Sequence, residues 1–227
     1  MTLLGLHTYI AFKIKPFLYQ RKMFFSSFLI GSVIPDIDII LVALCSIFLT
    51  QNESITIFHK TITHSFITAG IIYLFFLIIY EIKKNKIILN VAYGFTSGFV
   101  IHILVDTLIG FGKITLFWPL PIGALNGWDY TTISYNLENI ILCSEFIFFR
   151  LLASQLIKTL LNCRTIMKND NYIQYLASWM KIELYFFLVL LLTIIFIPEY
   201  KLIIFFILYI PSYVMSIHSI LKLRRYF

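Results

Sequence analysis

The sequence predicts an all-α polytopic membrane protein with about six transmembrane helices, a first span broken by proline, and a metal site between the first three spans. Of its 227 residues, 60% are hydrophobic and only 13% are charged, which is about half the charged share of a soluble domain. The mean hydropathy is +0.90. A chain this short cannot bury so many apolar residues inside one water-soluble core, so its surface must face lipid. Since no internal repeat or low-complexity segment divides the chain, we expect a single membrane domain over residues 1–227.

Two other classes of protein are excluded by composition. Cys45, Cys143 and Cys163 are odd in number, far apart and set in apolar runs, which argues against a secreted disulfide scaffold. The net charge of +7 is compatible with nucleic-acid binding, but the basic residues lie at the ends of apolar segments, where they orient a protein in a bilayer. We therefore expect the lipid bilayer as a partner, and no nucleic acid.

Six apolar segments approach the roughly 17–25 residues that a membrane-spanning helix needs. Residues 2–14 come before them and predict a helix that lies on or enters the membrane rather than a cleavable signal peptide. Residues 158–183 are more polar and predict a cytoplasmic linker that touches anionic headgroups, and the loop 110–136 is a candidate lid over the site. The candidate spans are residues 23–50, 64–82, 87–109, 137–157, 184–198 and 201–221.

The positive charges agree with six spans and both termini in the cytoplasm. In that topology fourteen of the 18 Lys and Arg residues fall on the cytoplasmic side, and only Lys60, Lys113 and Lys201 fall outside, as the positive-inside rule requires. Arg150 lies within the fourth span together with Glu145. We expect these two side chains to neutralise each other or to extend towards the membrane surface.

The third span carries the strongest polar signal. His102 and Asp106 are four residues apart, so they project from one face of a helix. Gly94 and Gly98 lie on nearly the same stripe, and small residues at this spacing let a neighbouring helix approach closely. We expect this close approach to bring ligands from other helices to His102 and Asp106. The alternative is ordinary helix packing, with His102 and Asp106 hydrogen-bonded to each other.

A second polar element, the block from His59 to Ser65, comes just before the second span. Thr63 suits a helix N-cap, which would leave His64 in the first helical turn. His59 and His64 are five residues apart, so one continuous helix does not align them, and a bend is needed for both to reach one ion. The alternative is a pair of histidines in an ordinary polar loop.

The third element is the Pro35-Asp36-Ile37-Asp38 segment inside the first span. Proline interrupts the helix, and backbone groups freed within a membrane must be satisfied by protein or by a water-filled cavity. Two carboxylates separated by one residue point in different directions. We expect one of them to bind an ion and the other to bind a second ion, orient a histidine or act as a general base, so Asp36 and Asp38 are the catalytic candidates.

These elements and the N-terminal His7 together predict one site for a divalent cation. Acidic and imidazole groups are costly at membrane depth unless a partner, water or a metal offsets the cost. Mixed imidazole and carboxylate ligands suit Zn, Mn or Fe, and we favour Zn or Mn. A bound divalent ion would activate a coordinated water for hydrolysis. The candidate metal ligands are His7, Asp36, Asp38, His59, His64, His102 and Asp106.

The order and spacing of these motifs resemble a known family. An N-terminal histidine, a PDxD segment, an HRGxTHS-like block and a glycine-containing helix that ends in HxxxD before Trp118-Pro119 resemble the YdjM-like inner-membrane proteins over residues 1–125. Lys60 stands where arginine is usual in that block, and Thr61 where glycine is usual. These proteins are described as membrane-bound metal-dependent hydrolases, some of them under LexA control. The resemblance implies a bacterial inner-membrane location and leaves residues 126–227 as additional helices.

Two functions follow from the predicted site. The first is a membrane-embedded metal-dependent hydrolase, in which a metal-activated water attacks an unknown ester or phosphoester of a small molecule or lipid, reached from the bilayer or the periplasmic side. The second is a non-enzymatic protein that binds or transports a metal or a proton. A transporter needs polar residues through both halves of the membrane, whereas the later spans offer little beyond Glu145, Arg150 and His218. This favours a one-sided site.

Overall fold

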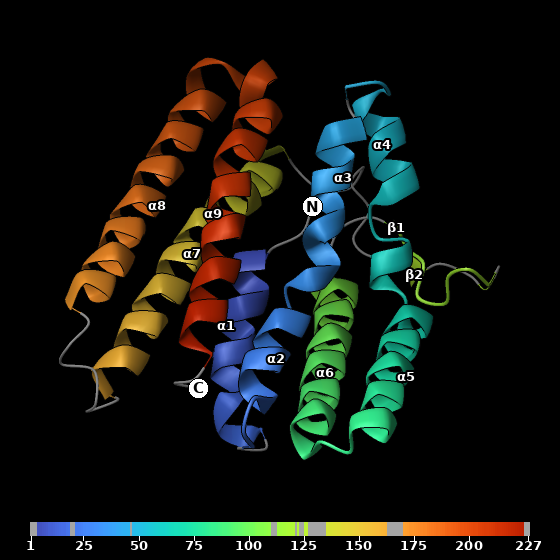
Figure 1. Cartoon of the computed structure of the whole chain (residues 1–227). Helices are drawn as coiled ribbons and strands as arrows, with labels where there is room; N and C mark the ends of the chain where they lie inside the picture. Colours follow the sequence, from blue (N-terminus) through green and yellow to red (C-terminus); the bar gives the residue numbers. More distant parts are fainter. Residues whose placement is uncertain are drawn as a thin grey trace. The chain divides into compact units, whose positions relative to one another are not determined.

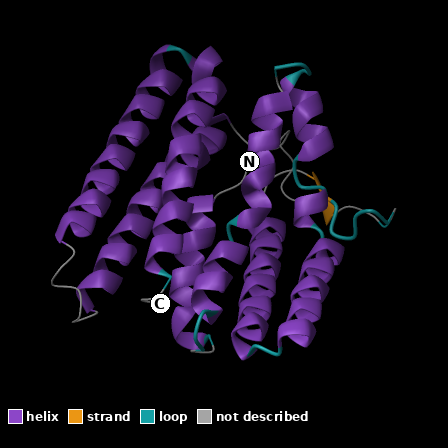
Figure 2. Ribbon diagram, in the orientation of Figure 1, coloured by secondary structure: helices purple, strands orange, loops and turns teal. Residues whose placement is uncertain are grey.

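A computed structural model gives the fold of the chain and confirms an all-α membrane protein (Figures 1 and 2). Five of the described helices are long and apolar enough to cross a membrane, and the number rises to six if one bent pair of helices is a single span. The contacts divide the chain into two compact units, which are described separately. The structure describes residues 4–18, 21–45, 47–109, 113–120, 122, 125–126, 135–162 and 170–224.

The first unit comprises Met1–Thr2 and Ile14–Ile133. Its longest helices are α5 and α6, which pack against each other, and α6 also packs against α2. Short helices connect these long ones and carry most of the polar residues of interest. In chain order the elements are η1 (Lys15–Phe17), α2 (Phe24–Gly31), η2 (Ile34–Ile37), α3 (Asp38–Cys45), α4 (Gln51–Phe58), η3 (Ile62–His64), α5 (Phe66–Lys83), α6 (Lys86–Ile109), β1 (Lys113–Ile114) and β2 (Leu125–Asn126).

The first span is broken at the predicted place. Phe24–Gly31 and Ile34–Val42 meet at an angle of 41°, and Pro35 lies in the first turn of the short helix η2 between them. Proline has no backbone N–H to continue the hydrogen-bond ladder of the preceding helix. The break leaves Asp36 and Asp38 fully or almost fully buried within the first unit.

Helices α2 and α6 are in backbone contact, as the glycine spacing predicted. A Cβ atom on Gly98 would lie 2.0 Å from the carbonyl oxygen of Phe28, and one on Gly94 would lie 2.3 Å from that of Phe24. Gly31 makes the reciprocal approach from α2, where a Cβ would lie 2.1 Å from the Phe95 oxygen. Only residues without a side chain allow this separation, so the glycines set the distance between the two helices.

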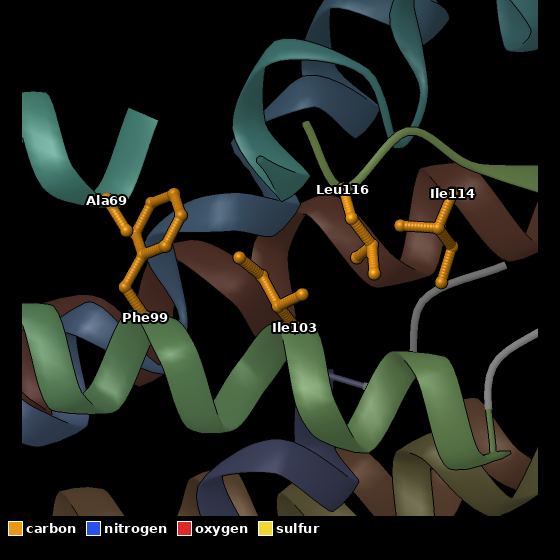
Figure 3. Packing of buried hydrophobic residues seen from close by; sticks show 5 residues of the cluster. All are labelled: Ala69, Phe99, Ile103, Ile114 and Leu116. Carbon is orange, nitrogen blue, oxygen red and sulfur yellow. The ribbon is translucent and has the colours of Figure 1, made fainter. Parts of the chain in front are cut away.

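The segment after α6 folds back over the start of α5. Ile114 and Leu116 pack in one buried cluster with Ala69 of α5 and with Phe99 and Ile103 of α6 (Figure 3). Ile114 belongs to a two-residue antiparallel ladder, in which Lys113 pairs with Asn126 and Ile114 with Leu125. The described part of the predicted lid, residues 113–120, is thus held by packing.

The N-cap of α5 is Ser65 rather than the predicted Thr63. The Ser65 Oγ accepts the backbone N–H of Ile67 at 3.1 Å and donates to the carbonyl oxygen of Trp118 at 2.8 Å, with the Leu116 oxygen at 3.2 Å. Thr63 is engaged elsewhere, in a hydrogen bond to Asp38. His64 therefore ends the separate short helix η3 instead of lying in the first turn of α5.

The second unit comprises Leu3–Lys13 and Ser134–Phe227. Its helices are α1 (Leu4–Ile14), α7 (Tyr135–Asn162), α8 (Asp170–Phe196), η5 (Pro198–Tyr200) and α9 (Lys201–Leu223). Glu145 and Arg150 of α7 each have a partner other than the one expected. Glu145 Oε1 accepts the N–H of Gly5 at 3.1 Å, at the positive end of the α1 dipole. Arg150 donates to the carbonyl oxygen of Met180 at 3.1 Å.

Most of the predicted linker at 158–183 is helical. Helix α7 continues to Asn162 and α8 begins at Asp170, so only residues 163–169, which lie outside the described residues, separate the two helices. The linker was predicted from its basic residues Lys158, Arg164, Lys168 and Lys181. In the structure Glu183 is buried inside α8 and accepts a hydrogen bond from the Trp179 indole one turn earlier. A paired acid does not have to end a membrane helix.

Candidate metal centre

Six buried or nearly buried polar side chains of the first unit converge where three chain segments meet. Asp36 and Asp38 come from the break in the first span, His59 and His64 from the segment between α4 and α5, and His102 and Asp106 from α6. Within this cluster Asp36, His64 and His102 form a group whose ligand atoms lie close enough to hold one metal ion.

The separations between these atoms match the spacing expected around one cation. His64 Nε2 lies 3.1 Å from His102 Nε2. Asp36 Oδ1 lies 3.4 Å from His102 Nε2 and 3.7 Å from His64 Nε2. Asp106 Oδ2 lies 3.2 Å from His64 Nε2. Nitrogen and oxygen ligands about 2.0–2.2 Å from a tetrahedral ion are separated from one another by about 3.3–3.6 Å, so the cluster has the right size.

The tautomer of each central histidine follows from the group that faces its other ring nitrogen. The Nδ1 of His102 lies 2.8 Å from the Ser32 carbonyl oxygen, which can only accept, so Nδ1 carries the hydrogen. The Nδ1 of His64 lies 3.0 Å from the Thr63 hydroxyl, and that hydroxyl donates to Asp38 Oδ2 at 2.9 Å. Thr63 therefore accepts from His64 Nδ1–H. In the neutral form of each ring, the hydrogen is therefore on Nδ1 and Nε2 is unprotonated.

The unprotonated Nε2 atoms of His64 and His102 face each other at 3.1 Å, and their lone pairs repel unless a proton or a cation lies between them. A proton or a metal ion satisfies this requirement, and the carboxylates of Asp36 and Asp106 favour the positive charge further. The Asp36 carboxylate is fully buried, and neither of its oxygens has a hydrogen-bond partner among the described residues. A buried carboxylate without donors is costly, so these residues fit a divalent cation with mixed nitrogen and oxygen ligands.

Asp38 and His59 form an outer layer of the cluster. Asp38 Oδ2 accepts from the backbone N–H of Lys60 at 3.0 Å and from the Thr63 hydroxyl, and it lies 3.5 Å from His64 Nδ1. Its Oδ1 lies 3.3 Å from His59 Nδ1. The ring centroids of His59 and His64 are 5.9 Å apart. Burial lowers the pKa of His59 below its ordinary value, against an opposing contribution from Asp38.

A family model matches residues 2–202 of the chain. The chain belongs to the YdjM inner membrane protein family. No curated protein and no solved structure shows a significant match to it. Membership agrees with the membrane-spanning helices of both units and supports an integral membrane location. The family match also extends beyond residue 125, where the sequence motifs end, and includes α7 and α8 of the second unit.

Several roles in this YdjM-family site were not visible in the sequence. Lys60 replaces the usual arginine of the family block, yet its ammonium lies 2.8 Å from Asp106 Oδ2 in the buried cluster. Asp106 therefore has a partner other than the His102 of its own helix. The sequence indicated Thr63 only as a member of the polar block from His59 to Ser65, and not as a partner of His64 and Asp38. The Ser32 carbonyl gave none, because any residue type supplies a backbone oxygen.

His7, the remaining predicted ligand, lies on α1, which belongs to the second unit. Its participation in the site stays a prediction.

Proposed function

We propose that this YdjM-family protein is a membrane-embedded hydrolase that holds a divalent cation, Zn or Mn, and cleaves an ester or phosphoester. The observation that carries the proposal is the 3.1 Å approach of His64 Nε2 and His102 Nε2, with both Nδ1 atoms already engaged. Imidazoles held in this way, with hydrogen-bonded outer nitrogens, are the usual form of metal-ligating histidine in proteins.

In this proposal each buried group has a separate role. His64 Nε2, His102 Nε2 and Asp36 Oδ1 would hold the cation, and Asp106 Oδ2, which lies near His64 Nε2, would supply the fourth ligand atom. A bound divalent cation lowers the pKa of a coordinated water and supplies a nucleophile at neutral pH. Asp36 Oδ2, which has no hydrogen-bond donor among the described residues, accepts the proton of the attacking water. Asp38 orients His64 through Thr63 and does not touch the substrate.

The position of the site along α6 supports a substrate that approaches from one membrane face. The basic residues Lys83, Lys84 and Lys86 mark one end of the α5–α6 pair. His102 lies sixteen residues beyond Lys86, or about 24 Å along a helix that rises about 1.5 Å per residue. With the basic end in the cytoplasm, His102 and Asp106 lie towards the outer leaflet. We therefore propose a lipid or another phosphoester substrate that enters from the bilayer or the periplasmic side.

The second candidate function is binding or transport of a metal or proton without catalysis. The same contact between His64 and His102 supports it, because a single proton shared between the two Nε2 atoms would also relieve their repulsion. It is less favoured because Lys60 balances only one of the three carboxylates Asp36, Asp38 and Asp106, so a single proton would still leave one negative charge, whereas a divalent cation would leave none.

The first test is metal analysis of the detergent-purified protein. We expect about one equivalent of divalent cation in the wild type and loss of that metal in His102→Ala and Asp106→Ala. His218→Ala is the matched control, because His218 is exposed on α9 of the second unit and its removal should leave the metal content unchanged. A wild-type protein that neither contains nor takes up Zn or Mn would refute the proposal.

The second test separates hydrolysis from transport. Wild-type protein loaded with Zn or Mn is assayed on a panel of phospholipids and soluble phosphoesters, with the metal-free His102→Ala variant as the blank. Turnover by the wild type alone supports the hydrolase. Cation or proton uptake into proteoliposomes, together with no turnover of any ester, supports the second candidate instead.

A further inference from the structure

Lys60 is one of the most deeply buried charged residues of the first unit. Its side chain is only 1% exposed, and its Nζ lies 2.8 Å from Asp106 Oδ2, which is itself 3.2 Å from His64 Nε2. An ammonium group loses much of its hydration when it is buried, so it is stable there only beside compensating negative charge. Asp106 supplies that charge and links Lys60 to the cluster.

The backbone of Lys60 is held as firmly as its side chain. Its φ is +58°, a left-handed conformation that is uncommon for residues other than glycine. Its N–H donates to Asp38 Oδ2 at 3.0 Å, and its carbonyl oxygen accepts from the Thr115 N–H at 3.3 Å and from the Thr115 hydroxyl at 3.1 Å. These three bonds fix the backbone of Lys60 and the direction in which its side chain leaves the backbone.

The ammonium changes the charge that the cluster offers to a cation. Asp36, Asp38 and Asp106 contribute three negative charges, and the histidines are neutral when they bind a metal. Among the residues that the structure describes, Lys60 forms an ion pair with Asp106, one of these three carboxylates. The cluster therefore carries a net charge of about −2 with Lys60 in place, and about −3 without it.

We propose that Lys60 is a specificity-determining residue that matches the site to divalent cations and disfavours trivalent ones. This inference rests on the cation site of the proposed function but not on hydrolysis. Electrostatic repulsion from a nearby ammonium is proportional to the charge of the ion, so Lys60 weakens the binding of a trivalent ion more than that of a divalent one. A neutral side chain at this position should remove that discrimination.

The test compares the affinities of the purified protein for Mn²⁺ and for Tb³⁺, a trivalent ion that binds carboxylate oxygens. Lys60→Met keeps most of the side-chain volume and removes the charge, so we expect the affinity for Tb³⁺ relative to Mn²⁺ to rise by at least about tenfold. Lys60→Arg keeps the charge and should keep the wild-type ratio. Lys84→Met is the matched control, because Lys84 is exposed and pairs with Glu81 at the far end of α5.

The possible outcomes distinguish this inference from the proposed function. If wild-type protein binds neither ion, the metal site itself is wrong. If wild type binds Mn²⁺ but Lys60→Met leaves the ratio of affinities unchanged, the role of Lys60 is refuted and the metal site stands. If Lys60→Met does not fold, Lys60→Gln gives the same test, because it keeps a hydrogen-bond donor for Asp106 and removes the charge. The Tb³⁺-to-Mn²⁺ ratio should again rise by at least about tenfold, and an unchanged ratio refutes the inference.

Discussion

The backbone contact between α2 and α6 makes Gly98→Ala the most informative single substitution for the site. The new Cβ would lie 2.0 Å from the carbonyl oxygen of Phe28, whereas real Cβ contacts start at about 3.0 Å. Since both atoms belong to helices, a side-chain rotation cannot relieve this clash. We expect α2 to retreat from α6 by about 1 Å.

Ser32 follows α2 directly and moves with it, so the retreat also displaces the Ser32 carbonyl oxygen, which contacts His102 in the proposed metal site. The present distance of 2.8 Å from the Ser32 oxygen to His102 Nδ1 would become about 3.8 Å, too long for a hydrogen bond. Loss of the bond that orients a metal-ligating histidine typically weakens metal binding by about 10–100-fold. The overpacking itself costs about 1–3 kcal/mol, and the higher helix propensity of alanine returns about 1 kcal/mol.

Gly70→Ala is the matched control, because a Cβ on Gly70 in α5 meets nothing within 4 Å. We expect Gly70→Ala to raise the free energy of unfolding by up to about 1 kcal/mol and to leave metal affinity unchanged. The two variants are compared by calorimetric Mn²⁺ or Zn²⁺ titration and by thermal unfolding in the same detergent. If Gly98→Ala binds the cation as tightly as Gly70→Ala does, the coupling between helix separation and the site is refuted.

Three further predictions concern the outer layer of the site. Asp38→Asn should weaken divalent-cation binding by about 10–100-fold by disturbing the orientation of His64, and wild-type affinity in a calorimetric titration would contradict this. Ser65→Ala removes the N-cap oxygen of α5 and should lower the free energy of unfolding by about 1–2 kcal/mol, so an unchanged denaturation midpoint would count against it. Burial lowers the pKa of His59 in the folded protein. Below a pH of about 6.5 the unfolded chain therefore binds a proton at this residue more readily than the folded protein does, and the free energy of unfolding decreases as the pH is lowered. The drop in Tm from pH 7.5 to 5.5 should therefore be smaller in His59→Gln than in the wild type, and equal drops would exclude the effect.

The helical membrane architecture was predictable because it depends on local properties. The apolar segments, the Pro35 break and the Gly94–Gly98 spacing are each contained in one continuous stretch of sequence, and the structure contains all three features. The end of α7 and the start of α8 were harder to predict. There the basic residues Lys158, Arg164, Lys168 and Lys181 predicted a linker, whereas the structure continues α7 to Asn162 and begins α8 at Asp170.

The candidate site was predictable as a set of residue types but not as a set of contacts. The spacing of His102 and Asp106 predicted a shared helix face that groups from other segments reach, with a bond between the two residues as the alternative, and the structure pairs Asp106 with Lys60. The four-residue spacing on α6 fixes a shared face, but it does not reveal what the rest of the chain brings to that face. Lys60 was undervalued for the same reason, because its role depends on a left-handed backbone that Asp38 and Thr115 hold in place.

The sequence by itself determined that this chain is built for lipid and that four of its five histidines lie in the front half together with Asp36, Asp38 and Asp106, because hydropathy and residue order are properties of short segments. Only the tertiary structure decided which ring nitrogen of His64 and of His102 lacks a hydrogen, and which carboxylate pairs with the Lys60 ammonium. Those properties follow from contacts such as Ser32 with His102 and Asp38 with Lys60, whose partners are 70 and 22 residues apart in the chain. Such pairs exist only after the helices have packed, so no local pattern can specify them.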